Sequence, residues 1–310
     1  MTNKERYRQL CETVGSQIPL FQQYWWMETV CAGKEWDVLL SERDGIIEGA
    51  LPYLIGRKFG LRYILQPQLT QFNGPWLSEG VGEKRAGQVL ADLERQLRHL
   101  HIAIYIQHFS PELSTINYKL LSLNYKLSPR VTYRFDPIPH PDTLTSLADR
   151  GRKRGLNAVD AAYVIDKEVG ASEFAYLHRS YWERRSGRDL LDEAFIQRVV
   201  GTCLDCRQGL LYGLRDGDGR LVAARFVAFD DHCAYALLSA MQPDALRNSM
   251  TRLVWALITD LYGRTDIFDF EGSMDPGIAH FYRSFGSTAT TYLEVSRFRP
   301  RILRHLLRKV

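Results

Sequence analysis

The chain has 310 residues, of which 45% are hydrophobic and 25% charged, and its formal net charge is +4. This length suits two domains, and the apolar content excludes a disordered chain. The charged N-terminal stretch MTNKERYRQLCETVGSQ lacks the apolar core of a secretory signal, and no apolar run reaches the length of a membrane span. We therefore expect a cytoplasmic protein and no DNA partner, because a net charge this small does not by itself indicate one.

The first half of the chain predicts a hairpin, a helix, a strand, a second helix and a final strand. WDVLLSERDGIIEGALPYLIG has two apolar runs around a turn at Asp44 and Gly45, which is typical of a β-hairpin. The apolar spacing of EKRAGQVLADLERQLRHL predicts a helix. In chain order, the expected elements cover 36–56, 83–100, 101–108, a helix from Ser110, and 130–135.

Between the halves, DPIPHPD carries three prolines and is typical of a linker. The next segment, TLTSLADRGRKRGLNAVDAAYV, holds four cations close together: Arg150, Arg152, Lys153 and Arg154. Such a cluster can bind phosphates, although composition alone favours a solvated helix face. The expected bounds are 1–135 for an N-terminal domain, 136–149 for a linker, 150–298 for a C-terminal domain and 299–310 for a C-terminal helix.

The second half repeats the order of elements in the first. QGLLYGLRDGDGRLVAARFVAF again predicts a hairpin, with a turn at Asp218 and Gly219 that matches Asp44 and Gly45. The match lies in element order and turn placement more than in residue identities. In chain order, the expected elements cover 208–229, 250–263, 265–272, a helix from Ser273, and 290–298. We therefore expect an α/β fold with a mixed sheet, built from two tandem repeats.

One strand end carries two acids directly before a helix, in the stretch FDFEGSMDPGIAHFYRSFG. Alternation places Asp269 and Glu271 on one face of the strand, and Phe268 and Phe270 on the other. Since α/β proteins tend to place ligand sites at the carboxyl ends of strands, the two acids are candidates for chemistry. Capping of backbone amides, or pairing with an arginine, explains them equally well.

The helix after this strand has recognisable start and stop signals. Asp275 can accept from the free amides of a first turn, and Pro276 suits the position after a cap. Gly286 suits the left-handed residue that closes a helix. The expected apolar face comprises Ile278, Phe281 and Phe285.

No metal site is expected. The five cysteines do not suggest a disulfide framework, and the CxxC at Cys203 and Cys206 has no second pair at zinc spacing. The segment RDGDGR lacks the ligand spacing and closing glutamate of a calcium loop, and it fits a hairpin turn instead.

The element order resembles the core of the GNAT acyltransferases. Two such units in tandem resemble the FemABX group, peptidyltransferases that add amino acids to peptidoglycan precursors. The residues that carry this resemblance are RGRKRGLNAV, GRLVAARFVAF, MTRLVWALI and GSMDPGIAHFYRSFG. The resemblance covers about residues 20–298. It implies a mixed α+β sheet in two tandem GNAT-like acyl-CoA N-acyltransferase domains.

Two departures from the family bear on the donor. SAMQPDALRNSM, residues 239–250, has no glycine where acyl-CoA-dependent GNAT enzymes carry a glycine-rich pyrophosphate loop. The resemblance therefore favours aminoacyl-tRNA as donor over acyl-CoA, and it implies no tightly bound cofactor. A lysine of the Fem signature falls on Tyr282 here, so Arg283 would have to supply a phosphate or carboxylate contact at that place.

The resemblance implies an enzyme that moves an aminoacyl or acyl group onto an amine of a peptidoglycan-type precursor or another small acceptor. Attack requires a neutral amine, so Glu271 or Asp269 would take the proton, with Tyr282 as proton donor or positioning group. The expected phosphate contacts are Arg150, Arg152, Arg154 and Arg283. An acyl-CoA-dependent GNAT enzyme and a GNAT-fold protein that binds a ligand without catalysis remain the alternatives.

The C-terminal segment FRPRILRHLLRKV alternates leucines with cations and predicts a basic amphipathic helix over 299–310. Such a helix can lie on the inner face of an anionic membrane, where a lipid-linked precursor would be met. It can equally contact tRNA phosphates. Packing on the domain through its leucines is the interpretation that the sequence favours.

Overall fold

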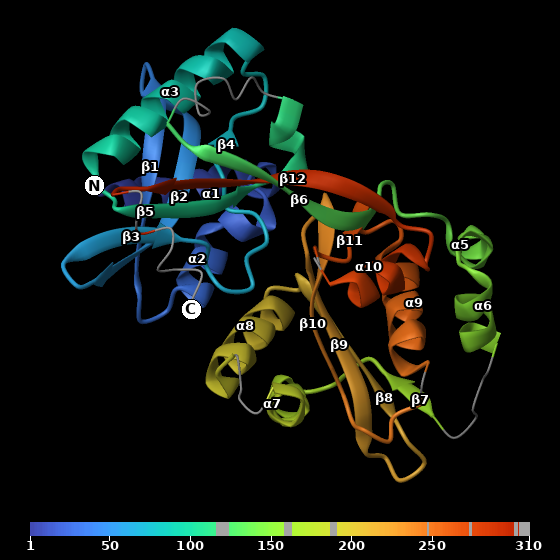
Figure 1. The fold of residues 1–310 in the computed structure, drawn as a ribbon. Coiled ribbons are helices and arrows are strands. Elements are labelled where there is room, and N and C mark those ends of the chain that lie inside the picture. The colour runs from blue at the N-terminus through green and yellow to red at the C-terminus, as the bar shows by residue number, and fades with distance from the viewer. Residues whose placement is uncertain are drawn as a thin grey trace. The chain divides into compact units, whose positions relative to one another are not determined.

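The computed structural model describes residues 1–115, 124–157, 163–186, 191–246, 248–272, 275–300 and 303. The chain divides into two compact units, coloured by residue number in Figure 1. Unit 1 contains Met1–Arg130 and Thr291–Val310, and unit 2 contains Val131–Thr290. Each unit combines helices with a mixed sheet, which confirms the predicted α/β class.

Unit 1 contains the first predicted hairpin, formed by β1 (Glu35–Arg43) and β2 (Ile46–Lys58) in antiparallel register. Asp44 and Gly45 both have positive φ in its turn, as their residue types favour. The other elements of unit 1 are α1 (Asn3–Val14), η1 (Gly15–Gln17), η2 (Leu20–Gln22), α2 (Tyr24–Val30), β3 (Leu61–Leu65), β4 (Trp76–Leu77), α3 (Glu83–His99), β5 (Ile104–Phe109) and η3 (Pro111–Thr115).

The strands of unit 1 follow the order β1-β2-β3-β5-β12, where β12 is Thr288–Phe298, and β4 pairs with β2. Only β3 and β5 run parallel among these pairs. The predicted helix is α3, whose apolar stripe of Val89, Leu93 and Leu97 is buried against the sheet. This stripe and the sheet residues beneath it form the core of the unit.

Unit 2 contains the second predicted hairpin, formed by β8 (Gly209–Arg215) and β9 (Leu221–Phe229). The remaining elements of unit 2 are α5 (Pro141–Leu147), α6 (Arg150–Asn157), β7 (Val164–Asp166), α7 (Ala171–Ser186), α8 (Glu193–Asp205), β10 (Cys233–Met241), α9 (Ser249–Leu261), β11 (Ile267–Asp269) and α10 (Pro276–Arg283). A strand that starts in unit 1, β6 (Lys126–Phe135), ends here.

The strand order of unit 2 is β7-β8-β9-β10-β11-β6, and β10 and β11 are its parallel pair. The order β8-β9-β10-β11 therefore repeats β1-β2-β3-β5, with the parallel pair at the same place in both units. This correspondence confirms the repeat predicted from element order.

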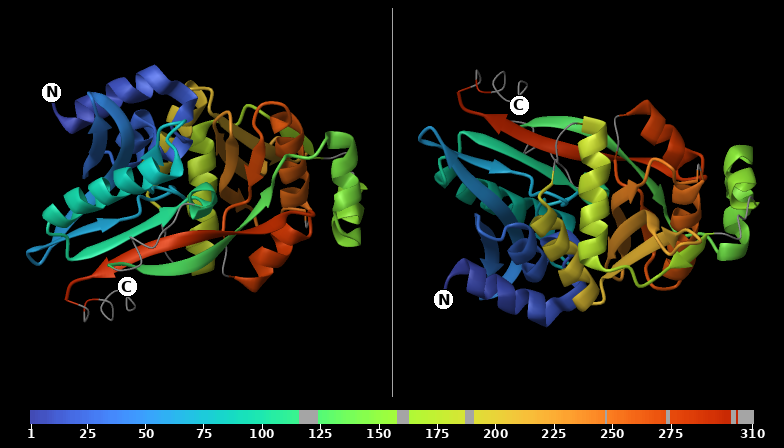
Figure 2. Two further views of the ribbon diagram at one scale, coloured as in Figure 1. Left: turned by 90° about the horizontal axis from the view of Figure 1, so that it is seen from above. Right: turned by 90° about the horizontal axis from the view of Figure 1, so that it is seen from below.

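Each half of the sequence contributes its last strand to the compact unit that the other half mainly forms. β6 ends the first half of the sequence, and its residues Arg134 and Phe135 pair with β11 in unit 2. β12 ends the second half, and its residues 293–298 pair with β5 in unit 1, as the red strand in Figures 1 and 2 shows. The compact units therefore differ from the predicted domains, which keep each terminal strand with its own half.

Several predicted boundaries are corrected by the structure. The strand expected over 265–272 is only Ile267–Asp269, because the backbone turns to φ 66° at Glu271. The expected apolar residue Ile278 is 45% exposed, since α10 packs through other positions. The helix expected from Ser110 begins as η3 and then leaves the described residues, as does most of the segment 299–310.

Candidate active site

Asp269, at the end of β11, is fully buried and has its oxygens occupied by unit 2 itself. Its Oδ2 accepts from Arg134 Nε at 2.6 Å, and Oδ1 accepts from the Thr132 hydroxyl. Oδ1 also accepts from the backbone N–H of Glu271 at 2.7 Å. Burial raises the pKa of Asp269, opposed by the Arg134 charge. With both oxygens engaged, Asp269 suits a positioning role better than that of a base.

Glu271 is held in a conformation that non-glycine residues rarely adopt, with φ 66°. The bond from its amide to Asp269 fixes this turn, so the buried acid orients the second one. Burial and the charge of Asp269 raise the pKa of Glu271 to about 8, opposed by Arg225. The carboxyl group therefore changes protonation near pH 8, which makes Glu271 a candidate for acid–base chemistry.

Two further side chains complete this cluster. Arg225 on β9 is buried, and its Nε has no hydrogen-bond partner in the described part of the chain. Burial raises the pKa of Tyr282 on α10, opposed by the charge of Arg225 and by a hydrogen bond to it. The Tyr282 ring also packs on Phe270, with 5.1 Å between centroids. Arg225, which lies two strands from β11 in the sheet, thus interacts with both Glu271 and Tyr282.

Sequence reasoning missed Arg225. The available signal was a single cation inside LVAARFVAF, a run whose nine residues are all buried in β9. A buried cation is costly unless an anion or a ligand compensates it. The interpretation of this run as a hairpin strand was correct, but it left the charge unexplained.

A groove of about 680 Å³ lies in unit 2 at the N-terminus of α9. Asn248, at the cap position of α9, donates to the carbonyl of Gly155 and does not cap the helix. The amino end of a 13-residue helix carries a partial positive charge that favours an anion. The residues lining the groove are Asp149, Gly151, Arg152, Arg154, Gly155, Leu246, Asn248, Thr251 and His280.

Arg152 is the most tightly held cation of this groove. Its Nε donates to Ser284 Oγ at 2.7 Å and its Nη1 to Thr251 Oγ1 at 2.8 Å. The guanidinium carbon lies 4.2 Å from the centroid of the Phe281 ring. Burial lowers the pKa of Arg152, opposed by Asp149. These contacts fix a planar cation at the groove, as phosphate recognition favours.

The four predicted phosphate contacts are placed differently. Arg152 and Arg154 line the groove, whereas Arg150 and Arg283 are not among its lining residues. The guanidinium carbon of Arg283 lies 5.9 Å from the Tyr133 ring instead. The structure therefore brings two of the four arginines together beside α9.

Helix α10 connects the groove with the acidic cluster. Asp275 accepts from the amides of Gly277 and Ile278 at its start, as predicted, with Pro276 in the first turn. His280 on this helix lines the groove. Tyr282 packs on the Phe270 ring, and the charge of Glu271 acts on its hydroxyl. A short helix fixed by its cap thus positions groups of both parts.

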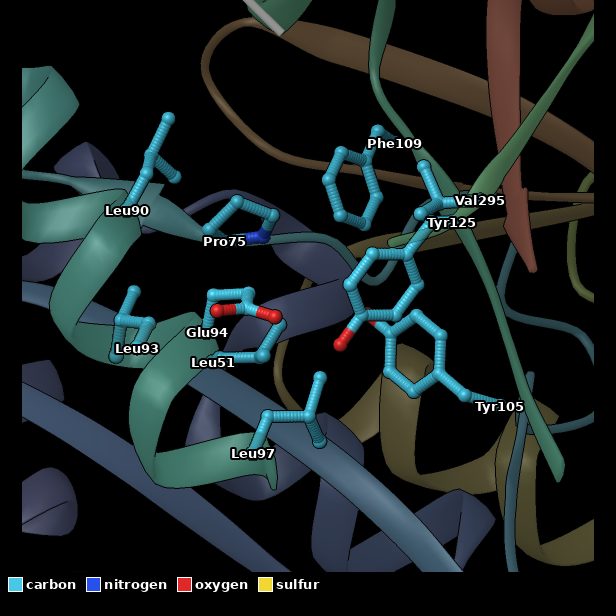
Figure 3. Close-up of a pocket in the computed structure, with 10 residues that line it drawn as sticks. All are labelled: Leu51, Pro75, Leu90, Leu93, Glu94, Leu97, Tyr105, Phe109, Tyr125 and Val295. Carbon is cyan, nitrogen blue, oxygen red and sulfur yellow. The ribbon is translucent and has the colours of Figure 1, made fainter. Parts of the chain in front are cut away.

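Unit 1 contains a much smaller cavity, of about 20 Å³, between α3, β5 and β12. Figure 3 shows Leu90, Leu93 and Leu97 of α3 facing Tyr105 and its aromatic neighbours. This volume holds about one water molecule. We interpret it as a packing gap and not as a substrate site.

Metal-binding clusters and membrane-spanning helices are both absent from the described residues. No group of three or more histidine, cysteine, aspartate or glutamate side chains gathers there in a way that could hold a metal ion. In the same part of the chain, no helix is both long enough and apolar enough to cross a membrane.

Known proteins resemble this chain in one segment and in overall fold. Residues 146–276 match the family model described as an Acetyltransferase (GNAT) domain. The structure of FemX is similar, with a TM-score of 0.71 and 13% identity, covering 94% of this chain and 96% of that chain. No curated protein sequence matches this chain significantly.

Two further solved structures have the same fold. One is the C-terminal domain of an Agrobacterium fabrum protein assigned as a lysylphosphatidylglycerol synthetase, with TM-score 0.60, 13% identity, and coverage of 96% and 93%. The other is a tandem GNAT protein from the clavulanic acid biosynthesis pathway, with TM-score 0.54, 11% identity, and coverage of 86% and 83%.

The segment 146–276 that matches the GNAT domain model contains Arg152, Arg225 and Glu271. The whole chain shares its fold with FemX and with a tandem GNAT protein. The resemblance expected from RGRKRGLNAV and GSMDPGIAHFYRSFG is thereby confirmed.

Proposed function

We propose that the protein is a FemABX-like transferase that moves an aminoacyl or acyl group onto an amine of a cell-envelope precursor. The observation that carries this proposal is Glu271, fixed by Asp269 at the end of β11 beside Arg225 and Tyr282. The similarity to FemX and to a lysylphosphatidylglycerol synthetase domain supports an envelope component as acceptor. Such precursors are met in the cytoplasm or at the inner membrane face, where we expect the protein to act.

In this proposal Glu271 takes the proton that the attacking amine must lose. A free α-amino group has a pKa of about 8, close to that of Glu271. Proton transfer between matched groups is efficient, and the ionised carboxylate would also orient the ammonium form beforehand. Tyr282, which is hydrogen-bonded to Arg225, would position the reacting groups or return a proton.

The groove at α9 supports a donor that carries phosphates. Arg152, Arg154 and the amino end of α9 supply positive charge there without a glycine-rich loop. We favour aminoacyl-tRNA as donor because that loop is absent from residues 239–250. Acyl-CoA is the second candidate, since the same groove of about 680 Å³ would also receive a pyrophosphate.

Native mass spectrometry with coenzyme A, acetyl-CoA and charged aminoacyl-tRNA tests the donor. We expect saturable binding of the charged tRNA, weakened at least tenfold by Arg152→Ala. Adducts with coenzyme A alone would identify the acyl-CoA enzyme. If neither donor binds, the proposed transferase is wrong and the ligand-binding alternative takes its place.

Transfer to a soluble peptidoglycan precursor tests the catalytic part. Glu271→Gln should lower turnover by about 10²- to 10⁴-fold, which is the usual contribution of a positioned base. Glu168→Gln is the matched control, because Glu168 is an exposed glutamate of the same unit. Equal turnover in both variants would remove Glu271 from the mechanism.

A further inference from the structure

The turn that joins β2 to β3 exposes large apolar side chains. Phe59 is 91% exposed and Leu61 is 37% exposed. Figure 1 shows this turn at the left edge of unit 1. Phe59 and Gly60 have φ of 53° and 74°, and a positive φ is uncommon for a bulky residue such as phenylalanine. The backbone therefore presents Phe59 to solvent, and Leu61 adds a second exposed apolar side chain at the same tip.

Cations surround this apolar tip. The Arg57 side chain is 64% exposed, and Lys58 Nζ lies 5.5 Å from the centroid of the Phe59 ring. Arg62 pairs with Arg57 across the hairpin, and its Nη1 donates to the carbonyl of Leu100. Among the described residues, Glu35 forms an ion pair with this group, 3.6 Å from Arg57. Positive charge therefore dominates beside the exposed ring.

The end of β12 adds another cation to the same edge of the unit 1 sheet. The amide of Ala103 donates to the carbonyl of Arg62, and the amide of Arg299 donates to the carbonyl of Ala103. The backbone at Arg299 is thus linked to Arg62 of β3 through Ala103, which bonds to both. The sequence that follows, RILRHLLRKV, contains four more arginines and lysines.

We propose that the β2–β3 tip, Arg57–Arg62, binds the surface of an anionic lipid bilayer. Phe59 and Leu61 enter the boundary between headgroups and acyl chains, and the arginines and lysine contact lipid phosphates. An aliphatic residue beside the ring suits acyl chains and not base stacking, which favours a membrane over RNA. A narrow tip of two apolar residues is also far smaller than a stable protein interface. This inference does not depend on the proposed transferase activity.

Vesicle co-sedimentation of the full chain tests the proposal. We expect binding to vesicles of phosphatidylcholine with phosphatidylglycerol, and little binding to phosphatidylcholine alone. Phe59→Ser should weaken binding about tenfold, equivalent to about 1.4 kcal/mol. The double variant Arg57→Ser, Lys58→Ser should weaken it similarly, and added salt should reduce binding of the parent chain.

Matched controls lie at the opposite end of β2. Ile46 is 68% exposed, and the Arg43 side chain is 64% exposed. Ile46→Ser and Arg43→Ser remove the same kinds of group and should leave vesicle binding unchanged. A chain ending at Pro300 measures the separate contribution of the C-terminal segment, and Phe59→Ser should weaken that shortened chain further.

A direct readout distinguishes insertion from surface contact. Phe59→Trp should bind as the parent does, and lipids brominated on the acyl chain should quench its added fluorescence. Absence of added quenching would overturn the proposal. So would equal losses in Phe59→Ser and Ile46→Ser, equal binding to both vesicle types, or a Phe59→Ser defect in tRNA binding without one in vesicle binding.

Discussion

Replacing Glu271 by glutamine tests the acidic cluster without knowledge of any substrate. The substitution keeps the size of the side chain and removes its ability to ionise. In the folded chain the pKa of Glu271 is about 8, against an ordinary value of 4.5. The folded state therefore binds this proton more tightly than the unfolded state does. Consequently the contribution of Glu271 to stability is complete below pH 4.5 and declines as the pH rises toward 8.

The magnitude follows from the two pKa values. At about 1.4 kcal/mol for each pH unit, the full difference is about 5 kcal/mol. Because part of the Glu271 residue reaches solvent, which screens its charge, we expect the free energy of unfolding to change by about 2 kcal/mol. For a unit of this size, that corresponds to about 4–8 °C in Tm. Above pH 8 the glutamine variant should be the more stable protein by that amount.

Thermal unfolding between pH 4.5 and 9 is the assay, with Glu168→Gln as control. The parent should lose stability relative to Glu271→Gln as the pH rises, and the two curves should meet near pH 4.5. The control should follow the parent at every pH. Parallel curves for parent and Glu271→Gln would refute the raised pKa, and with it the matching of Glu271 to an amine.

Three other substitutions have defined outcomes. Asp269→Asn removes the charge that faces buried Arg134, so it should lower the free energy of unfolding in urea by about 3 kcal/mol. The control Asp231→Asn, at an exposed residue, should lower it by less. Arg152→Lys loses the planar stacking on Phe281 and one of two hydrogen bonds. It should therefore lower the free energy of unfolding by about 1–2 kcal/mol and weaken pyrophosphate binding. Unchanged pyrophosphate affinity would contradict the assignment of the groove as a phosphate site. Glu294, held near His108 and Arg130 with its pKa lowered to about 2, contributes stability above pH 4.5 that is lost as the pH falls toward 2. Glu294→Gln should therefore cost about 2 kcal/mol at pH 7 and nothing near pH 2, which acid titration of the unfolding midpoint will check.

Local patterns in the sequence predicted the hairpins, the cap of α10 and the repeated element order. These features depend on contacts between residues close in the chain, such as Asp275 with the first amides of its helix. The apolar run 221–229 also predicted a strand, which is β9. Apolar periodicity is a property of each segment alone, so it can be recognised without knowing which segments pack against it.

The site needed more than local patterns. Two acids at alternating positions looked equivalent, but Asp269 pairs with Arg134, which lies 135 residues earlier in the chain and engages one of its carboxylate oxygens. Strand β11 is shorter than predicted because Asp269 accepts a hydrogen bond from the amide of Glu271. The alternation of side chains along a strand does not predict such a bond. Arg225 could not be recognised as part of the cluster until β9, β11 and α10 were placed in one unit.

The sequence by itself thus determined the two hairpins, the helices and strands that repeat after them, and which family the second half resembles. The tertiary structure decided which strand completes which unit, as β12 pairs with β5 and β6 with β11. It also decided which acid is a candidate base and which arginines share a groove. Pairing and electrostatics join residues distant in the chain, and the free energies that select those partners are set by burial in the folded state.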